Sequence, residues 1–541
     1  MYSPELIKRL TDLLAPDGFS PREESESKYP TRSLPEGARV MRVPPSPTGF
    51  VHIGTVYAGL LNERLAHQSK GVFILRIEDT DKKREVEGST DQIISAFKSF
   101  DISYDEGPDK DATYGPYFQS EREKIYLGYA IELLNSGRAY PCFATPEELK
   151  SAVEDQQAKK QRPGYYGDWA LWRDKTEAEI TEALDANKPF VLRFKSNGDH
   201  NKRIQYVDLF KGKMEVPEND LDVPLIKSDE HRLPTYHLAH VVDDYLMRVT
   251  QVLRSDEWLP STALHIELAQ ALNIKPFTYG HFAPISIIDK NGGGKRKLSK
   301  RKDPEADVQF WLKAGYPVEG IKAYLLGLAN SNFEDWHRVN KDKSLNDFPL
   351  SIEKLAASRS PLLDMTKMED YCKDYIANLP QDEFDEQLLA WAKDDAPYLV
   401  NEVEKDQGYA KKVFAIERDG EKPRKDLACW SGVPDQYGYF FDELFGPHFA
   451  TRIEKELEDL EPKTVIGVCE EFLKTYDVSD NQEEWLAKCR ASAEQLGLNL
   501  RDYARILRVK LTGKNRTPDL WTMMQVMGES RVQSRLSSRK S

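Results

Sequence analysis

The sequence predicts an α/β fold in its N-terminal part and an all-helical C-terminal third. Two observations predict the α/β part: a strand–helix–strand pattern over residues 38–77, and a second strand followed by a helix after Pro234. The length of the chain predicts more than one domain, because 541 residues exceed what one hydrophobic core usually supports. We therefore expect several domains, with the two α/β segments completing one sheet in space.

The first α/β segment has the clearest pattern. A short strand over residues 40–43 leads into a turn rich in Pro and Gly over 44–49, and an apolar-periodic helix around Leu60 follows. Residues 72–77 are a dense run of apolar β-forming residues, typical of a buried parallel strand. This alternation predicts a sheet of the nucleotide-binding type.

The other segments carry weaker patterns. Residues 1–37 predict a short amphipathic helix and a polar connector, which form an extension rather than a domain. Between 131 and 227 helix and strand signals alternate irregularly, which favours an inserted domain. We also expect a strand over 245–254, a helix over 318–328 with apolar spacings of 3, 4 and 3, and a later helix capped by Thr517.

Charge and composition exclude several classes of protein. Asp and Glu outnumber Lys and Arg by 90 to 76, and the resulting net charge of −14 argues against nonspecific coating of nucleic acid. Nucleic-acid contacts must therefore use local basic patches, and two exist: six basic residues at 295–302 and ten at 501–541. Their plainest interpretation is a pair of solvated faces. No apolar run approaches the ~18 residues that a bilayer requires, so we expect no membrane span.

The cysteines and the N-terminus indicate the compartment. Five scattered cysteines form no C-x-x-C pair, so neither a disulfide scaffold nor a Cys-rich metal site is expected, and no metal-ligating residues are predicted. The N-terminus has no signal-peptide core, and residues 22–26 are too acidic for a transit peptide. We therefore expect a cytoplasmic protein in a reducing environment.

The turn over residues 46–55 (Ser-Pro-Thr-Gly-Phe-Val-His-Ile-Gly-Thr) joins a strand to a helix. Free backbone N–H groups and the positive end of the helix dipole meet there, which suits a phosphate. Gly49 and Gly54 would let a nucleotide approach the backbone closely, and His52 and Thr55 can donate hydrogen bonds to a phosphoryl oxygen. A lone histidine beside an apolar stretch is more often a core residue, but this one stands within a larger motif.

A cationic segment at residues 297–301, Lys-Leu-Ser-Lys-Arg, follows the glycine-rich residues 291–294. Such a loop can swing onto the β- and γ-phosphates of ATP. A Walker A motif does not compete, because Gly294-Lys295 is followed by Arg and position 289 is not Gly. The order of the turn, an insertion, a second strand–helix unit and this loop resembles the two signature sequences of class I aminoacyl-tRNA synthetases.

The closer resemblance is to the glutamyl-tRNA synthetases of bacterial type, and it covers about residues 38–541. It is carried by Arg-Val-Pro-Pro-Ser-Pro-Thr-Gly at 42–49, Arg-Ile-Glu-Asp-Thr-Asp at 76–81, Pro-Thr-Tyr-His-Leu-Ala-His-Val-Val-Asp-Asp at 234–244, Arg254, Glu257-Trp258, and Leu-Arg-Val-Lys-Leu-Thr-Gly at 507–513. Several separated motifs in the right order make coincidence very improbable.

The resemblance implies roles for individual residues. Arg42 and Arg254 resemble the arginines that hold the carboxylates of glutamate, and a guanidinium suits this because it binds a carboxylate bidentately. Glu78 resembles the acid that meets the α-ammonium, with Ser46 nearby. Tyr236 resembles a pocket wall with a hydroxyl donor.

Further site residues follow from the same resemblance. His240 is also expected to bind glutamate, but it stands where some members have Asn, so it ranks below the two arginines. Asp243-Asp244 could act on the nucleotide side of the site, but a helix N-cap is an equal interpretation, so the pair is left out of the site. The expected catalytic residues are His52, Thr55 and Lys300, and the expected ATP-binding residues are Pro47, Thr48, Gly49, His52, Gly54, Glu257, Lys297 and Lys300.

The resemblance also divides the chain. The expected parts are an N-terminal extension (1–37), a Rossmann-like catalytic domain in two halves (38–130 and 228–290), an inserted tRNA acceptor-binding domain (131–227), a stem-contact region with the Lys-Leu-Ser-Lys-Arg loop (291–370) and a helical anticodon-binding domain (371–541). Some relatives carry a cysteine-based zinc knuckle in the insertion, whereas Cys142 has no nearby cysteine, so no structural zinc is expected.

The implied reaction joins glutamate to tRNA(Glu) at the expense of ATP, accompanied by Mg²⁺, in a monomeric enzyme whose activation step depends on tRNA. Charging of tRNA(Gln) as well as tRNA(Glu) stays open. Four rival functions are a glutaminyl-tRNA synthetase, a truncated paralogue that would lack residues 371–541, a small nucleotidyltransferase sharing only the first motif, and an inactive tRNA-binding paralogue. The presence of His52 and Lys300 argues against the last of these.

Overall fold

The structure is a computed structural model that describes residues 2–110, 113–289, 292–357, 361–418, 420 and 422–537. It contains two compact units: unit 1 comprises Met1–Gln309 and Leu325–Leu363, and unit 2 comprises Phe310–Tyr324 and Asp364–Ser541. Asn291, the first residue of the predicted glycine-rich segment, lies outside the described residues, as do Arg539 and Lys540 of the C-terminal basic patch.

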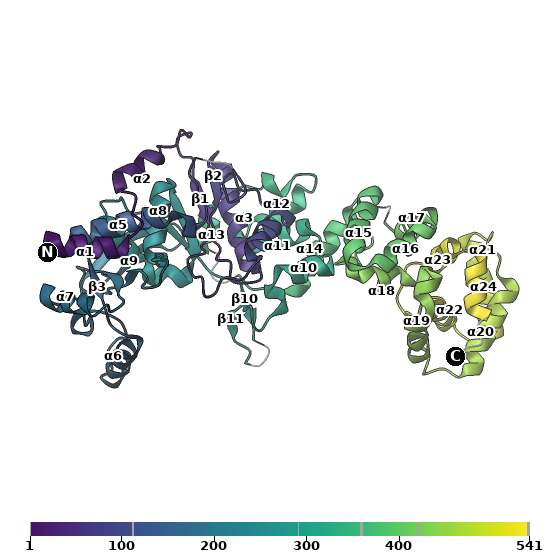
Figure 1. The fold of residues 1–541 in the computed structure, drawn as a ribbon. Coiled ribbons are helices and arrows are strands. Elements are labelled where there is room, and N and C mark those ends of the chain that lie inside the picture. Colours follow the sequence, from purple (N-terminus) through teal and green to yellow (C-terminus); the bar gives the residue numbers. More distant parts are fainter. Residues whose placement is uncertain are drawn as a thin grey trace. The chain divides into compact units, whose positions relative to one another are not determined.

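Two parallel strand pairs form the α/β part of unit 1. The elements are β1 (Val40–Val43), α3 (Ile53–Gln68), β2 (Val72–Leu75), β8 (Gln251–Ser255), α9 (Thr262–Ala271) and β9 (Thr278–Phe282). β1 pairs with β2 and β8 pairs with β9, each in parallel. The N–H of Thr250 donates to the Val40 carbonyl at 3.0 Å, which links the two pairs through β1 and β8. The predicted α/β fold class is therefore present, completed by segments distant in sequence (Figure 1).

The strand predicted over residues 245–254 is wrong in its first half. Tyr245 and Leu246 end helix α8 (Tyr236–Leu246), and β8 begins only at Gln251. Arg248 separates the two elements, because its φ of 59° lies in the left-handed region that a continuing helix or strand excludes.

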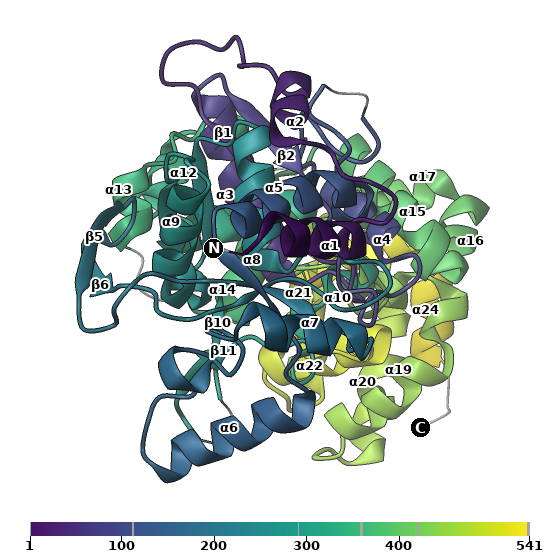
Figure 2. The ribbon, with the colours of Figure 1, turned by 60° about the vertical axis from the view of Figure 1, so that its left-hand side comes forward.

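Residues 131–227 contribute two small antiparallel sheets. The elements are β3 (Ala139–Cys142), α6 (Pro146–Ala158), α7 (Glu177–Asp185), β4 (Val191–Phe194), β5 (Arg203–Asp208), β6 (Gly212–Pro217) and β7 (Pro224–Ile226). One sheet has the order β3–β4–β7, and β5 pairs with β6 as a separate hairpin. Helix α6 lies at the edge of unit 1 in both ribbon views (Figure 1, Figure 2).

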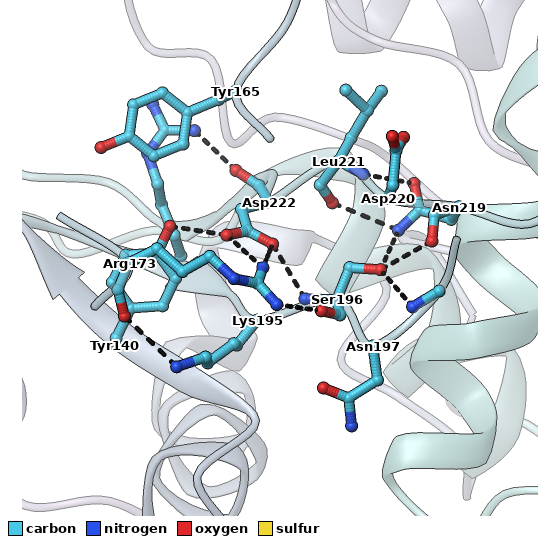
Figure 3. A network of polar contacts seen from close by, with 12 residues as sticks. Tyr140, Tyr165, Arg173, Lys195, Ser196, Asn197, Asn219, Asp220, Leu221 and Asp222 are labelled. Carbon is cyan, nitrogen blue, oxygen red and sulfur yellow. Dashed lines mark hydrogen bonds and ion pairs between the residues drawn. The ribbon is translucent and has the colours of Figure 1, made fainter. Parts of the chain in front are cut away.

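A buried carboxylate holds this region together (Figure 3). Asp222 accepts hydrogen bonds from the Tyr140 hydroxyl at 2.8 Å, from Arg173 at 2.5 and 2.6 Å, and from the N–H of Ser196 at 2.9 Å. Because these partners come from three separate segments, Asp222 fixes the loops at the end of the small sheet. The network is internal and has a structural role.

The N-terminal extension packs on unit 1. Its helices are α1 (Pro4–Leu14) and α2 (Arg22–Lys28), and both contact α5 (Glu123–Asn135). Leu6, Leu10 and Leu14 of α1 are buried in the core that α5 also lines, and α1 lies beside α5 in both views (Figure 1, Figure 2). The polar connector predicted after the first helix contains a second helix, α2. Arg122 donates to the hydroxyl of Tyr29 at 3.0 Å and so ties the connector to the core.

The remaining elements of unit 1 are α4 (Ser89–Ser99), β10 (Ser286–Ile288), β11 (Lys295–Lys297), α12 (Phe333–Val339) and α13 (Ile352–Ala357). β10 and β11 form an antiparallel hairpin, so the cationic segment begins at the end of a strand. Leu298 is buried, and it anchors the loop that follows this hairpin.

Helices make up all the regular secondary structure in the described part of residues 371–537, as the sequence predicts. The elements from α10 onward, apart from the α12 and α13 given above, are α10 (Val308–Ala314), α11 (Val318–Ala329), α14 (Met365–Asn378), α15 (Gln381–Asp395), α16 (Pro397–Lys405), α17 (Gln407–Phe414), α18 (Val433–Tyr437), α19 (Asp442–Glu456), α20 (Pro462–Thr475), α21 (Gln482–Gln495), α22 (Leu500–Thr512), α23 (Leu520–Met527) and α24 (Glu529–Ser537). Thr517 is not an N-cap: Asp519 caps α23 by accepting from the N–H of Thr522.

Candidate active site

A cavity of about 760 Å³ opens at the carboxyl ends of β1 and β8. This size suits a small-molecule site. Eleven of the residues predicted for the site line it, namely Arg42, Ser46, His52, Gly54, Thr55, Glu78, Tyr236, Arg254, Glu257, Lys297 and Lys300. Pro47, Thr48, Gly49 and His240 are not among its lining residues.

The turn near residue 50 and the loop near residue 300 lie against each other in unit 1. Lys300 Nζ donates to the Phe50 carbonyl at 2.8 Å and lies 5.0 Å from the centre of the Phe50 ring. The N–H of Val308 donates to the Val51 carbonyl at 3.0 Å. Segments 250 positions apart therefore form one wall of the cavity.

His52 occupies the N-cap of α3. Its Nδ1 accepts from the N–H of Gly54 at 2.8 Å, so the proton of the neutral ring sits on Nε2. Burial is the main cause that lowers the pKa of His52, and Lys300 and Lys297 lower it further. The ring is thus a neutral hydrogen-bond donor at pH 7. A Cβ at Gly54 would lie 2.8 Å from His52 Nδ1, which explains the need for glycine there.

Residues 47–49 build the turn that leads to this cap, and they do not line the cavity. The Pro47 carbonyl accepts from the N–H of Val86 at 3.0 Å and from the Ser89 hydroxyl at 3.0 Å, which anchors the turn to the start of α4. Gly49 has a φ of 110°, a conformation that side chains other than glycine's rarely adopt. These residues position the end of α3.

Arg42 lines the cavity, although its side chain is fully buried. Its Nε lies 3.0 Å from Asp244 Oδ2, and its Nη1 donates to the Leu253 carbonyl at 3.3 Å. Its Nη2 has no hydrogen-bond partner among the described residues. Because a buried N–H without a partner is costly, this nitrogen is ready to bind an anionic ligand.

Asp243 and Asp244 are core ion-pair residues, and the N-cap interpretation is wrong because both lie near the C-terminal end of α8. Asp244 pairs with Arg76 at 2.6 Å as well as with Arg42. Asp243 pairs with Arg122 at 2.7 Å. Sequence reasoning missed this buried cluster, which supports the side chains that line the cavity.

Glu78 ends the same charge cluster at the cavity. Arg76 Nη2 lies 3.3 Å from its Oε1, and Gln119 Nε2 lies 3.5 Å from the same oxygen. Burial raises the pKa of Glu78 to about 7, against the opposing effect of Arg76 and Arg42. The cavity thus holds a carboxyl group that a cationic ligand would ionise.

Aromatic rings form the opposite wall. The Tyr236 ring is stacked on His240 with centroids 5.5 Å apart and lies 4.2 Å from Trp258. His240 sits behind Tyr236, with Nδ1 2.8 Å from Asp244 and Nε2 3.2 Å from the Tyr279 hydroxyl. Burial lowers the pKa of His240 to about 3, so it is neutral. His240 therefore supports the ring of Tyr236 and does not line the cavity.

Arg254 is the second guanidinium of the cavity. It donates to the Tyr236 hydroxyl at 3.4 Å and to Thr262 Oγ1 at 3.0 Å. Across the described ranges, no carboxylate lies within ion-pair distance of it. A buried cation of this kind favours an anionic ligand.

The exposed side of the cavity carries charges of both signs. Lys297 Nζ lies 2.5 Å from Glu257 Oε2, in an ion pair that is half-exposed. Arg296, in contrast, is paired with Asp303 at 2.6 Å. The basic patch at 295–302 is thus partly neutralised, and Lys297 and Lys300 are its cations at the cavity.

Part of the C-terminal basic patch is also paired with acidic side chains. Arg505 contacts Asp459 at 2.8 Å, and Lys514 contacts Asp435 at 2.7 Å. Arg531 and Arg535 share Asp442. Arg501 and Arg516 are exposed.

No cluster of three His, Cys, Asp or Glu side chains with the geometry of a metal site occurs in the described ranges. Cys142 Sγ lies 3.2 Å from the Tyr165 hydroxyl in a buried contact. Within the same ranges, none of the helices combines the length and apolarity needed to cross a membrane.

Comparison with known families agrees with this arrangement. Residues 39–359 match the family described as tRNA synthetases class I (E and Q), catalytic domain, and residues 387–539 match the family described as anticodon binding domain. A catalytic cavity lined by both signature segments, followed by a helical domain of this kind, defines a class I aminoacyl-tRNA synthetase.

Individual relatives show to which family within this class the chain belongs. The glutamate–tRNA ligase of Clostridium beijerinckii is 42% identical over 98% of this chain and 98% of its own length, and that of Acetivibrio thermocellus is 39% identical over 98% and 99%. The solved glutamate tRNA ligase of Elizabethkingia meningosepticum, in complex with its amino acid, has a TM-score of 0.70 and 26% identity over 92% of this chain and 98% of that chain. The chain belongs to the glutamate–tRNA ligase family.

Proposed function

We propose that the protein activates L-glutamate with ATP to form glutamyl-adenylate and transfers the glutamyl group to the 3′-terminal adenosine of tRNA(Glu). The observation that carries this proposal is a single cavity bounded by both signature segments and by Arg42, Glu78 and Arg254. The names of the relatives, all glutamate–tRNA ligases, support the same reaction.

The charges of the cavity match glutamate. Its two carboxylates would meet Arg42 and Arg254, of which one has an unpartnered Nη2 and the other contacts no carboxylate in the described part of the chain. Its ammonium would meet Glu78, with Ser46 beside it and Tyr236 as the wall. Two guanidinium groups and one carboxyl group complement two carboxylates and one ammonium.

The activation step would use the end of α3. A carboxylate oxygen of glutamate attacks the α-phosphorus of ATP in line, and pyrophosphate leaves. The helix dipole, the neutral Nε2–H of His52, the Thr55 hydroxyl and the Lys300 ammonium would stabilise the charge that builds on the phosphoryl oxygens. In the second step a ribose hydroxyl of the 3′-terminal adenosine of tRNA loses its proton and attacks the adenylate carbonyl, and AMP leaves.

The ATP side of the site would include Glu257 and Lys297 at the mouth of the cavity. Residues 47–49 would act through the shape of the turn. Mg²⁺ prefers to keep waters and bind substrate phosphates. In this scheme the ion would therefore be held mainly by the triphosphate.

Aminoacylation with radiolabelled glutamate on purified tRNA(Glu) and tRNA(Gln), run in parallel, tests the proposal. Charging of tRNA(Glu) supports it, and charging of neither tRNA refutes it. Charging of both tRNAs would show that the enzyme also accepts tRNA(Gln). In this scheme residues 131–227 bind the acceptor end, and the helical domain binds the anticodon. We also place the enzyme in the cytoplasm as a monomer, in line with its five free cysteines.

A further inference from the structure

Arg254 lies in a shell of neutral hydrogen-bond acceptors. Besides Tyr236 and Thr262, its Nε donates to His281 Nε2 at 2.9 Å, and its Nη1 lies 3.0 Å from His265 Nδ1. Arg254 and His281 are register partners on the parallel strands β8 and β9. Strand pairing therefore sets the first of these contacts.

The arginine dictates the tautomer of His281. An arginine nitrogen is always a donor, so His281 Nε2 must be the acceptor and the ring must carry its proton on Nδ1. His281 Nδ1 lies 2.5 Å from Asp208 Oδ2. Burial lowers the pKa of His281, although Asp208 opposes this, and the ring is neutral at pH 7. A relay thus runs from Asp208 through His281 to Arg254.

The carboxylate of Asp208 is itself fixed by the backbone. Its Oδ1 accepts from the N–H groups of Phe210 at 2.9 Å, Lys211 at 3.0 Å and His281 at 3.2 Å. Its Oδ2 is left for the imidazole of His281. Hydrogen bonds from His281 and from this backbone lower the pKa of Asp208 and outweigh the effect of burial, so the group is ionised.

We propose that Asp208 and His281 are positioning residues for Arg254, which keep its guanidinium oriented while the compensating negative charge stays one imidazole ring away. A carboxylate in direct contact would occupy the guanidinium fork and compete with the substrate. A carboxylate behind a neutral ring leaves that fork available. The inference rests on the proposed function, in which Arg254 binds a carboxylate of glutamate.

Asp208 reaches this site from another part of the chain. It ends β5, in the hairpin of residues 203–217, and the N–H of Leu209 donates to the Tyr279 carbonyl of β9 at 2.8 Å. Asp208 and His281 are 73 positions apart. The hairpin therefore contributes a residue that acts on the cavity without lining it.

Asp208→Asn tests the relay with almost no change in shape. The amide oxygen would stay with the three backbone N–H groups, and the NH₂ group would replace Oδ2 opposite His281. The imidazole would then have to accept at Nδ1 and protonate Nε2, which places two donors face to face at Arg254. Loss of a carboxylate that orients a histidine is known to give the wrong tautomer in an intact fold.

The expected result is a rise of about tenfold to a hundredfold in the KM for glutamate, the range of one hydrogen bond to a charged group. The KM for ATP should stay within about twofold, since the proposed function assigns Arg254 to glutamate and not to ATP. Glu215→Gln is the matched control, because it is the same change on the same hairpin at an exposed residue that contacts Gln205. An unchanged KM for glutamate in Asp208→Asn would overturn the proposal.

A second pair of variants separates positioning from packing. His281→Gln can present a carbonyl to Arg254 and an N–H to Asp208, whereas His281→Leu offers neither. We expect His281→Gln to retain more glutamate affinity than His281→Leu. Equal KM values for the two variants would contradict the relay.

A measurement on the wild-type protein does not depend on whether any variant folds. In the ¹⁵N-histidine-labelled full-length protein, the His281 ring should give the nitrogen shifts of an Nδ1–H tautomer. An Nε2–H tautomer would overturn the proposal even if glutamate is charged normally. Failure of the wild type to charge glutamate would instead refute the proposed function and leave the tautomer result standing.

Discussion

Replacing Asp244 with asparagine removes a negative charge from the buried cluster while keeping its shape. Asp244 is 0% exposed and lies 3.0 Å from Arg42, 2.6 Å from Arg76 and 2.8 Å from His240. Breaking a buried ion pair by removing one partner costs about 3–5 kcal/mol. We expect about 3 kcal/mol, the lower end, because Glu78 remains beside Arg76 and the amide oxygen still accepts a hydrogen bond.

That cost corresponds to a measurable shift in melting temperature. In a unit of about 350 residues, an unfolding entropy of about 2.1 cal/mol/K per residue converts it to roughly 4 °C. Calorimetry should record the shift, and the KM for glutamate should rise because Arg42 loses its anchor. Asp185→Asn is the control: its 2.7 Å pair with Arg9 is 65% exposed on the Asp185 side and is worth about 0–1 kcal/mol. Equal shifts in the two variants would refute the reasoning.

The same variant has a defined pH dependence. Burial alone would raise the pKa of Asp244, but Arg42 and Arg76 hold it well below the usual 3.8. A depressed pKa in the folded state contributes stability that is present above pH 3.8 and is lost as the pH falls through the lower folded value. The difference in stability between wild type and Asp244→Asn should therefore be constant at neutral pH and shrink only in strong acid.

Three further outcomes are expected. His52→Ala should lower the rate of ATP–pyrophosphate exchange, measured with tRNA present, by ~10²-fold, and a near-normal rate would remove His52 from the activation step. Because burial raises the pKa of Glu78 to about 7, the KM for glutamate should fall as the pH rises through 7, and Glu78→Gln should abolish that trend. Replacing the exposed Arg501 and Arg516 with Gln should reduce the slope of log affinity for tRNA against log salt by about two, whereas an identical slope would exclude them from the phosphate contacts.

The turn near residue 50 and the loop near residue 300 could be predicted because each is a local pattern. A Pro/Gly turn between strand and helix has one main structural meaning, and a cationic loop behind glycines has few. Their contact through Lys300 and Phe50, 250 positions apart, is not a local pattern, and only the resemblance to the class I synthetases places the two segments at one site. Residues whose chemistry depends on near neighbours in sequence are thus accessible to sequence reasoning.

The buried charges were not accessible in this way. Asp244 and Arg42 are 202 positions apart, and Asp243 and Arg122 are 121 apart, so no local pattern announces either pair. Asp243 and Asp244 are of a residue type that commonly caps helices, but ion pairs with residues distant in sequence determine their role. Arg248 ended α8 through a left-handed φ that a non-glycine residue rarely signals.

The N-terminal helix has a practical consequence for anyone preparing this enzyme. Leu6, Leu10 and Leu14 cover apolar surface on α5, and Tyr29 accepts a hydrogen bond from Arg122, whose charge balances Asp243. Deleting the first 37 residues would expose this apolar surface of α5 to solvent. It would also remove one hydrogen-bond acceptor of Arg122. The shortened protein should aggregate during purification. An affinity tag should therefore be added to the full-length chain and should not replace these residues.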